Sequence, residues 1–354
     1  MSINDGDSLL TFVYHVSKAG LPIQCDVQLR STKHSGPRPV LVSFHGGALF
    51  VGSRRDAMIA PSLLEALLAS GVIIVYPDYR MLDPSTIYDQ LEDIEALFTY
   101  LATTAFSSSL PVGLSVDLDR VSLIGFSAGS FLARQATVHL IKAAAARSNA
   151  IKLRAAVFYF GMGGNCFLDT WVQSKIDPAA VKPQHLVDGT AANELADCPY
   201  TAGLEGYHNC EIRATWCTWW WASGNFYDLC FGKPGLAARL RAIDSVEGRA
   251  ADMLAASESK RYEEVFPELF LAGNPLATMW PPTLMVHGSG DPIVPYQESL
   301  KTQEQLSAFG VPVTLFTVPN GDHDLVDYDT KAILPEQEAA YLETADFLIK
   351  HLTS

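Results

Sequence analysis

Ser127 is the residue of this chain best placed by its neighbours to act as a nucleophile. It lies in the pentapeptide 125–129, Gly-Phe-Ser-Ala-Gly, after the apolar run 121–124 and before the helix-forming segment 131–146. This order predicts a strand, a sharp turn and a helix, with glycines that let strand and helix pack closely while the serine hydroxyl points out of the turn. The alternative is an ordinary helix N-cap, a position that serine favours.

A general base and an orienting acid follow in the last third of the chain. Asp291 comes shortly after the apolar segment 282–287, and His323 comes after the strand-like segment 311–318. A serine hydroxyl is a poor nucleophile at neutral pH, so it needs a base within hydrogen-bond reach and a carboxylate that orients this base. Because parallel strands place their sites at their carboxyl ends, we expect Ser127, His323 and Asp291 to meet at one edge of a sheet.

The predicted acid has competitors. Asp291 alternatively only forms the turn before a proline. Four further aspartates surround the histidine in sequence: Asp322, Asp324, Asp327 and Asp329. Asp291 is preferred because a carboxylate adjacent in sequence to His323 is poorly placed to accept a hydrogen bond from its Nδ1–H.

These residues, with a loop upstream of them, resemble the α/β-hydrolase superfamily and within it the hormone-sensitive-lipase-like esterases. The order nucleophile, acid, base is that of the superfamily. The loop 45–48, His-Gly-Gly-Ala, is similar to the family's His-Gly-Gly-Gly, and the pentapeptide 125–129 is similar to its Gly-Asp-Ser-Ala-Gly. Segment 78–84 is similar to its Tyr-Arg-Leu-Ala-Pro-Glu stretch, and Asp93 has the spacing of a helical aspartate that follows it.

By position, the resemblance implies an oxyanion hole. Its donors would be the N–H groups of Gly47, Ala48 and Ala128, with Gly46 as a further member. Two departures from the family bear on the substrate: Ala48 stands where the family has its third glycine, and Phe126 replaces the aspartate before the nucleophile. The methyl group of Ala48 is expected to lie near the acyl group of the substrate.

Strands and helices alternate along most of the chain. Residues 11–30 are typical of an antiparallel pair at a sheet edge, residues 72–76 and 152–160 are predicted strands, and residues 89–103 form an amphipathic helical pattern. A helix is also predicted from Pro61 to a glycine ten residues later. The alternation predicts an α/β fold with a mainly parallel, doubly wound sheet, and the resemblance implies an α/β-hydrolase fold with eight strands.

A long insertion follows the sixth predicted strand. The next clear strand begins near residue 282, and an unstructured loop of this length is unexpected in a compact domain. We therefore predict a mostly helical cap over residues 163–275, between core segments 1–162 and 276–354, with helix over 236–270. Aromatic residues gather in this insertion and are expected to form an apolar wall over the site or only the cap's own core. The predicted substrate contacts are Phe126, Trp216, Trp219, Trp220 and Phe226.

Composition excludes several function classes. The chain has 354 residues, is 48% hydrophobic and 18% charged, and carries a net charge of −14, which disfavours nucleic acid as a partner. No apolar run approaches membrane-spanning length, and the first residues lack a signal-peptide pattern, so a cytoplasmic location is expected. Six cysteines are expected to be reduced thiols, and their spacing does not predict a zinc site.

The predicted function is that of a serine carboxylic-ester hydrolase. Its substrate would be a small to medium, apolar acyl ester or thioester, and water would resolve the acyl-serine without metal or cofactor. One alternative keeps the acyl-serine but transfers the acyl group or closes a lactone in a biosynthetic pathway. Another is a non-catalytic ligand-binding protein on the same fold.

Overall fold

In the computed structural model, the described residues are 7–31, 36–56, 58–148, 151–175, 211–256 and 259–353. Within them, eight strands form one sheet in the order β1-β2-β4-β3-β5-β6-β7-β8. The strands are β1 (Asp7–Val16), β2 (Pro22–Arg30), β3 (Arg38–Phe44), β4 (Ile73–Pro77), β5 (Val116–Phe126), β6 (Leu153–Tyr159), β7 (Thr283–Gly288) and β8 (Val313–Val318).

The sheet is parallel except at one edge. Strands β1 and β2 pair antiparallel with each other, β2 pairs antiparallel with β4, and all other neighbours pair parallel. The predicted eight-stranded, mainly parallel sheet and its antiparallel edge are therefore confirmed. Parallel strands joined by helices place their carboxyl ends at a common edge, and this edge carries the site described below.

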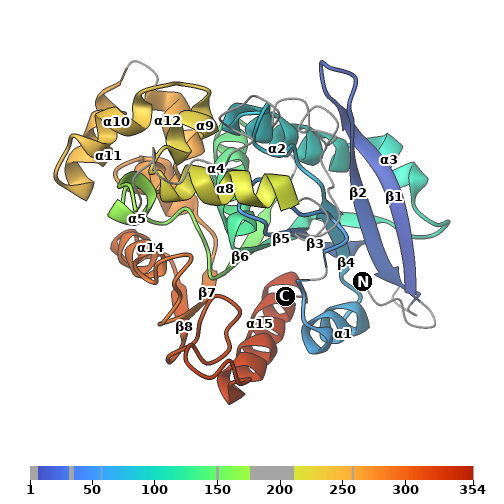
Figure 1. Ribbon diagram of the computed structural model, residues 1–354. Helices are drawn as coiled ribbons and strands as arrows, with labels where there is room; N and C mark the ends of the chain where they lie inside the picture. Colours follow the sequence, from blue (N-terminus) through green and yellow to red (C-terminus); the bar gives the residue numbers. More distant parts are fainter. Residues whose placement is uncertain are drawn as a thin grey trace.

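Helices cover both faces of the sheet (Figure 1). Residues of β3 show why its sequence is continuously apolar: Val40 and Val42 pack into the core on one face, and Leu41 packs into the core on the other. The second core includes residues of α1 and α15, whereas α2 and α4 contribute to the first. The helices of the two layers are α1 (Pro61–Ala69), α2 (Ile87–Leu101), α3 (Thr104–Ser109), α4 (Ala128–Ala145), α14 (Gln297–Ala308) and α15 (Pro335–Thr353).

Each named element described between β6 and β7 is a helix, and these elements include the helices predicted over 236–270 (Figure 1). Its elements are α5 (Asp169–Val172), α8 (Glu211–Ala222), α9 (Phe226–Phe231), α10 (Leu236–Arg241), α11 (Val246–Ala255), α12 (Ser259–Val265), α13 (Pro267–Leu271) and the 3₁₀ helix η2 (Pro275–Met279). The division into core and cap segments at residues 162 and 275 stays a prediction. No helix in the described part of the chain is long and apolar enough to cross a membrane.

A buried ion pair fixes the segment after β4. Arg80 Nε donates to Asp93 Oδ1 of α2 over 2.9 Å, and the Arg80 backbone N–H donates to Asp93 Oδ2 over 2.8 Å. Both side chains are buried. The neighbouring Tyr79 hydroxyl donates to the carbonyl of His45 over 2.9 Å. Arg80 and Asp93 therefore hold the backbone from which Tyr79 supports the loop 45–48.

We expect the Asp93→Ala variant to be destabilised by about 3 kcal/mol, because it removes the buried carboxylate that accepts from both the backbone N–H and Nε of Arg80. Glu92 is the matched control, since it also pairs with Arg80 but its side chain is 37% exposed. Glu92→Ala should cost less than about 1 kcal/mol. Urea unfolding followed by tryptophan fluorescence measures both, and equal losses would contradict the role of the buried pair.

Candidate active site

The turn between β5 and α4 exposes Ser127 as the pentapeptide predicts. Ser127 has a φ of 53°, and its N–H donates to the Tyr159 carbonyl of β6 over 3.0 Å. A Cβ added to Gly125 would lie 2.3 Å from the carbonyl oxygen of Gly129, and one added to Gly129 would lie 2.2 Å from that of Phe44. The turn therefore requires glycine at both positions, because strand and helix approach more closely than a side chain allows.

The structure brings the three predicted triad residues together. His323 Nε2 lies 2.9 Å from Ser127 Oγ, and His323 Nδ1 lies 2.7 Å from Asp291 Oδ2. These distances fit a neutral imidazole that donates from Nδ1 to the carboxylate and accepts the serine hydroxyl proton at Nε2. The arrangement has the geometry required to activate a serine hydroxyl.

Both carboxylate oxygens of Asp291 have hydrogen-bond donors close to them. Its Oδ1 accepts from the N–H groups of Ile293 and Val294 over 2.8 and 3.0 Å, and its Oδ2 lies 3.2 Å from His287 Nε2 as well as near His323. Burial by itself would raise the pKa of Asp291, but the hydrogen bonds from His287 and His323 outweigh it and hold the pKa at about 2. The carboxylate therefore stays ionised at neutral pH.

His287 is a contact of the acid that the sequence analysis did not assign. Its Nδ1 lies 2.8 Å from Ser299 Oγ, and its Nε2 lies 3.0 Å from the Val294 carbonyl in addition to Asp291. The side chain is fully buried. Its place at the end of a strand, four residues before Asp291, was the available signal.

Two of the competing aspartates, Asp322 and Asp327, bond within the histidine loop instead. Asp322 accepts from the N–H groups of Asp324 and Val326 and from Lys331 Nζ. Asp327 accepts from the N–H and hydroxyl of Thr330. These bonds fold the loop that carries the histidine.

Two of the four predicted oxyanion donors lie beside Ser127. Ala48 and Ala128 line the same cavity as the serine, and neither N–H has an acceptor among the described residues. Gly46 differs from the expectation, because its N–H donates to Met58 Sδ over 3.0 Å and is thus engaged. Gly47 forms the turn: a Cβ there would lie 1.9 Å from the Val51 carbonyl oxygen, at a φ of 108°.

His45 supports the loop 45–48 through its buried ring. Its ring stacks on Tyr79 with centroids 4.3 Å apart, and its Nδ1 lies 2.7 Å from the Gly46 carbonyl. Burial lowers the pKa of His45 to about 4, so the ring is neutral at pH 7. The neutral ring therefore braces the loop 45–48.

An apolar cavity of about 220 Å³ opens at Ser127. Ala48 and Ala128 line it, and the helical insertion contributes aromatic side chains to its walls. The further lining residues are Met162, Trp171, Cys217, Thr218, Trp221, Phe226, Ile293 and Val294.

The predicted substrate contacts are only partly found at this cavity. Phe226 lines it, whereas Trp219 and Trp220 do not; Trp221, the next residue along α8, does. Trp216 falls outside the residues whose side chains are described. Sequence analysis missed Trp171 and Trp221 because helical phase decides which aromatic residues face the cavity.

The prediction for Phe126 is corrected by its packing. Its ring is buried against Tyr159 and Phe160, with centroids 5.1 and 6.3 Å away, and does not line the cavity. As the last residue of β5, Phe126 contributes to the core that also contains α1 and α15 residues. Alternation along the strand directs it to that face.

Helix α8 is tied to the core by a buried arginine. The buried Arg213 donates to the carbonyls of Phe50, over 2.9 Å, and of Leu82 and Asp83. Cys217 and Trp221 follow four and eight residues later on the same helix face and line the cavity. Arg213 therefore sets the position of one cavity wall.

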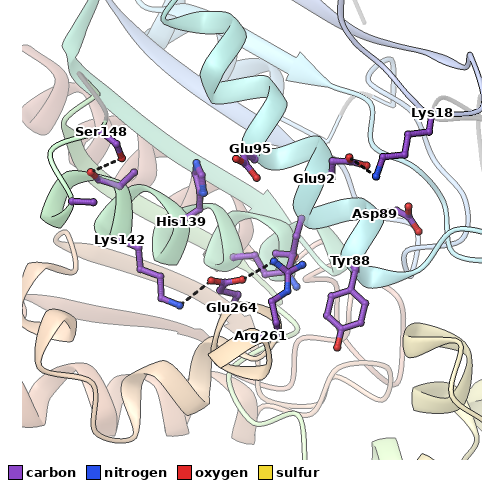
Figure 2. A pocket seen from close by; sticks show the side chains of 14 residues that line it. Lys18, Tyr88, Asp89, Glu92, Glu95, His139, Lys142, Ser148, Arg261 and Glu264 are labelled. Atoms are coloured by element: carbon purple, nitrogen blue, oxygen red, sulfur yellow. Dashed lines mark hydrogen bonds and ion pairs between the residues drawn. The ribbon is translucent and has the colours of Figure 1, made fainter. Parts of the chain in front are cut away.

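A second cavity, of about 620 Å³, lies among α2, α4 and α12 (Figure 2). Its charged side chains largely pair with one another: Lys142 and Arg261 both contact Glu264, and Lys18 contacts Glu92. None of the triad residues lines it. The insertion's thiols at 166, 217 and 230 are free, as is Cys25, and Cys198 and Cys210 lie outside the described residues.

Two family models match separate parts of the chain. The BD-FAE model matches residues 25–180, and the prolyl oligopeptidase family model matches residues 250–348. These matches include the segments that carry Ser127, Asp291 and His323.

Among curated proteins, the chain is similar to parts of fungal polyketide synthases. Non-reducing polyketide synthase pkbA of Emericella nidulans is 24% identical over 91% of this chain and 13% of its own length. The 5-methylorsellinic acid synthase of Aspergillus terreus is 24% identical over 94% of this chain and 13% of its own length. Probable carboxylesterase M8 of a Phoma species is 35% identical over 29% of this chain and 34% of its own. The chain thus spans only a small part of the synthases that it matches.

Solved structures share the fold. A bacterial heroin esterase matches with a TM-score of 0.60 at 18% identity, over 99% of this chain and 86% of its own. An esterase of Pyrobaculum calidifontis matches with a TM-score of 0.58 at 18% identity, over 98% of this chain and 86% of its own. Carboxyl esterase 2 of Tuber melanosporum matches with a TM-score of 0.58 at 16% identity, over 98% and 87%.

The low pKa of Asp291 predicts a pH-dependent stability that the Asp291→Asn variant lacks. Because the folded-state pKa lies below the ordinary 3.8, ionised Asp291 stabilises the fold fully above about pH 4, and this contribution of about 2 kcal/mol disappears as the pH falls toward 2. Urea unfolding across this range should show a steeper loss for the wild-type protein than for the variant. Parallel pH dependences would contradict the assignment.

Proposed function

Because this chain belongs to the α/β-hydrolase superfamily and is esterase-like, we propose that it is a serine hydrolase that cleaves carboxylic esters through an acyl-serine intermediate. The observation that carries the proposal is the chain of contacts from Ser127 through His323 to Asp291 at the mouth of an apolar cavity. This combination supplies an activated nucleophile and a site for an acyl group.

His323 would remove the Ser127 proton as the hydroxyl attacks the carbonyl carbon. Asp291 would hold the imidazole in the required tautomer and stabilise the imidazolium that forms. The proton then passes from His323 to the leaving alcohol. Next, a water molecule attacks the carbonyl carbon of the acyl-serine while His323 takes a proton from it. This proton returns to the Ser127 oxygen as the acid is released. Asp291 remains ionised throughout.

The N–H groups of Ala48 and Ala128 are proposed as oxyanion donors, with Gly47 as a further member. Their support is that Ala48 and Ala128 adjoin Ser127 at the cavity and have no acceptor among the described residues. Loss of one such donor in a serine hydrolase costs about a hundredfold or more in turnover. Gly46 is left out of the set because its N–H is donated to Met58.

The substrate is proposed to carry a small to medium apolar acyl group. The cavity beside Ser127 measures about 220 Å³, and its walls are Met162, aliphatic residues and aromatic rings, with Thr218 and Cys217 as the polar side chains besides the serine. Because the insertion supplies Trp171, Trp221 and Phe226, we propose that residues 163–275 act as a cap that shapes acyl selectivity.

We expect Ser127→Ala to abolish turnover of p-nitrophenyl acetate and butyrate, by at least about 10³-fold, because the nucleophile is removed. The fold should be kept, since alanine occupies the turn without a larger side chain. Circular dichroism and thermal unfolding check this. Ser107→Ala, at an exposed serine of α3, is the control and should keep full activity.

Labelling by a fluorophosphonate probe separates the enzyme from a ligand-binding protein on the same fold. Wild-type protein should be modified at Ser127, whereas Ser127→Ala should stay unmodified. Retained turnover in the variant, or an unlabelled wild-type serine, would exclude the proposed mechanism.

A second candidate is cleavage or transfer of an acyl thioester in a biosynthetic pathway. It is favoured by the similarity to polyketide synthases along nearly the whole of this chain. The same triad would form the acyl-serine, and a hydroxyl group of the acyl chain or of another molecule would replace water as the attacker. Acyl N-acetylcysteamine thioesters test this: free acid as product indicates hydrolysis, and a lactone or new ester indicates transfer.

A further inference from the structure

The loop that follows β6 is held by the buried carboxyl groups of two glutamates. The N–H groups of residues 163–165 donate to Glu298 Oε2 over 3.0, 2.5 and 2.6 Å, and the next N–H, that of Cys166, donates to Glu268. Both glutamates lie in the protein interior. A buried polar group is costly unless hydrogen bonds replace its hydration, so the four successive N–H groups and the two carboxyl groups fix each other.

Two glycines make this contact possible. A Cβ added to Gly164 would lie 2.1 Å from the Glu298 carbonyl oxygen, and one added to Gly163, which has a φ of 103°, would lie 2.6 Å from the ring of Phe131. The loop therefore approaches α14 at backbone distance. Larger residues at these positions would push its N–H groups away from the carboxylate.

The second oxygen of Glu298 holds a wall of the active-site cavity. Trp171 Nε1 donates to Glu298 Oε1 over 2.5 Å. Trp171 lines the cavity, and so does Met162, which directly precedes the loop bound by Glu298. Glu298 itself does not line the cavity. The Glu298 side chain thus fixes Trp171 and the loop after Met162 without lining the cavity itself.

Glu298 also connects this wall to the acid of the triad. It lies in the first turn of α14, which follows the loop that carries Asp291 and the cavity residues Ile293 and Val294. The buried Arg134 is the nearby cation and donates to Thr302 Oγ1, one turn further along α14, over 2.8 Å. The wall and the acid loop are thereby joined to one helix end.

We propose that Glu298 is a positioning residue that sets acyl-chain selectivity by fixing Trp171 and the loop after Met162. This inference rests on the proposed ester hydrolysis and concerns the same cavity. An acetyl group needs little of the wall, whereas a longer or bulkier acyl group has to pack against Trp171 and Met162. Discrimination among acyl groups should therefore depend on Glu298 more than the chemical step does.

The test compares kcat/KM for p-nitrophenyl acetate, butyrate, hexanoate and benzoate. In Glu298→Gln, one acceptor oxygen becomes an NH₂ group that faces N–H donors, so the loop and Trp171 lose their common anchor. The ratio of the best acyl ester to acetate should change by about tenfold or more, while acetate turnover changes by less than about threefold.

Trp171→Phe is the second variant: it removes the bond to Glu298, keeps a ring in the wall and also makes that ring smaller. It should shift the ratio in the same direction as Glu298→Gln. Glu268→Gln is the matched control: Glu268 accepts from the N–H of Cys166 in the same loop, whereas the Trp171 indole donates to Glu298. Burial and the charge of Glu298 raise the pKa of Glu268 to about 8, so the neutral amide resembles its protonated form and should keep the wild-type ratio.

An unchanged ratio in Glu298→Gln would overturn the inference, as would an equal change in Glu268→Gln. If Glu298→Gln does not fold, Gly164→Ala decides, because its Cβ would lie 2.1 Å from the Glu298 carbonyl oxygen and displace the loop without changing a lining residue. A shifted ratio then supports the inference and an unchanged ratio overturns it. If the wild-type protein turns over none of these esters, the proposed function fails and this inference with it. If the wild-type protein turns over the esters and the variants keep its kcat/KM ratios, only this inference is overturned.

Discussion

The carboxylate of Asp291 is the contact on which the arrangement of the site depends. It accepts from His323, from His287 and from two backbone N–H groups, so its position and its charge are both fixed. A histidine can orient toward Ser127 only if its other nitrogen has a partner that does not move. The low pKa of Asp291, about 2, follows from the same donors.

The cavity beside Ser127 is built by anchors that lie outside it. Arg213 ties α8 to carbonyls of the core, and Glu298 ties the loop after β6 and Trp171 to α14. Each is a buried charge, and a buried charge without partners is too costly to persist. The partners of Arg213 are backbone carbonyls, and those of Glu298 are loop N–H groups and the Trp171 indole. Each anchor therefore fixes one segment relative to another.

Sequence analysis succeeded where a function depends on a short local pattern. The turn at Ser127 needs glycine on both sides for steric reasons, and this requirement is visible in five residues. It did less well for the cap. Phe126, Trp219 and Trp220 were expected at the cavity, but strand alternation and helix rotation direct other side chains there, among them Trp171 and Trp221. Gly46 was expected to donate to an oxyanion, but it donates to the distant Met58.

The sequence by itself indicated the alternation of strands and helices, the mainly parallel sheet and the choice of Ser127, Asp291 and His323 as candidates, because periodicity and turn residues are local properties of the chain. Only the tertiary structure decided that His287 also contacts the acid, that Glu298 carries the loop after β6, and which aromatic rings face the cavity. These contacts join residues that are distant in sequence or depend on side-chain direction, and their geometry exists only once the sheet and its helices have packed.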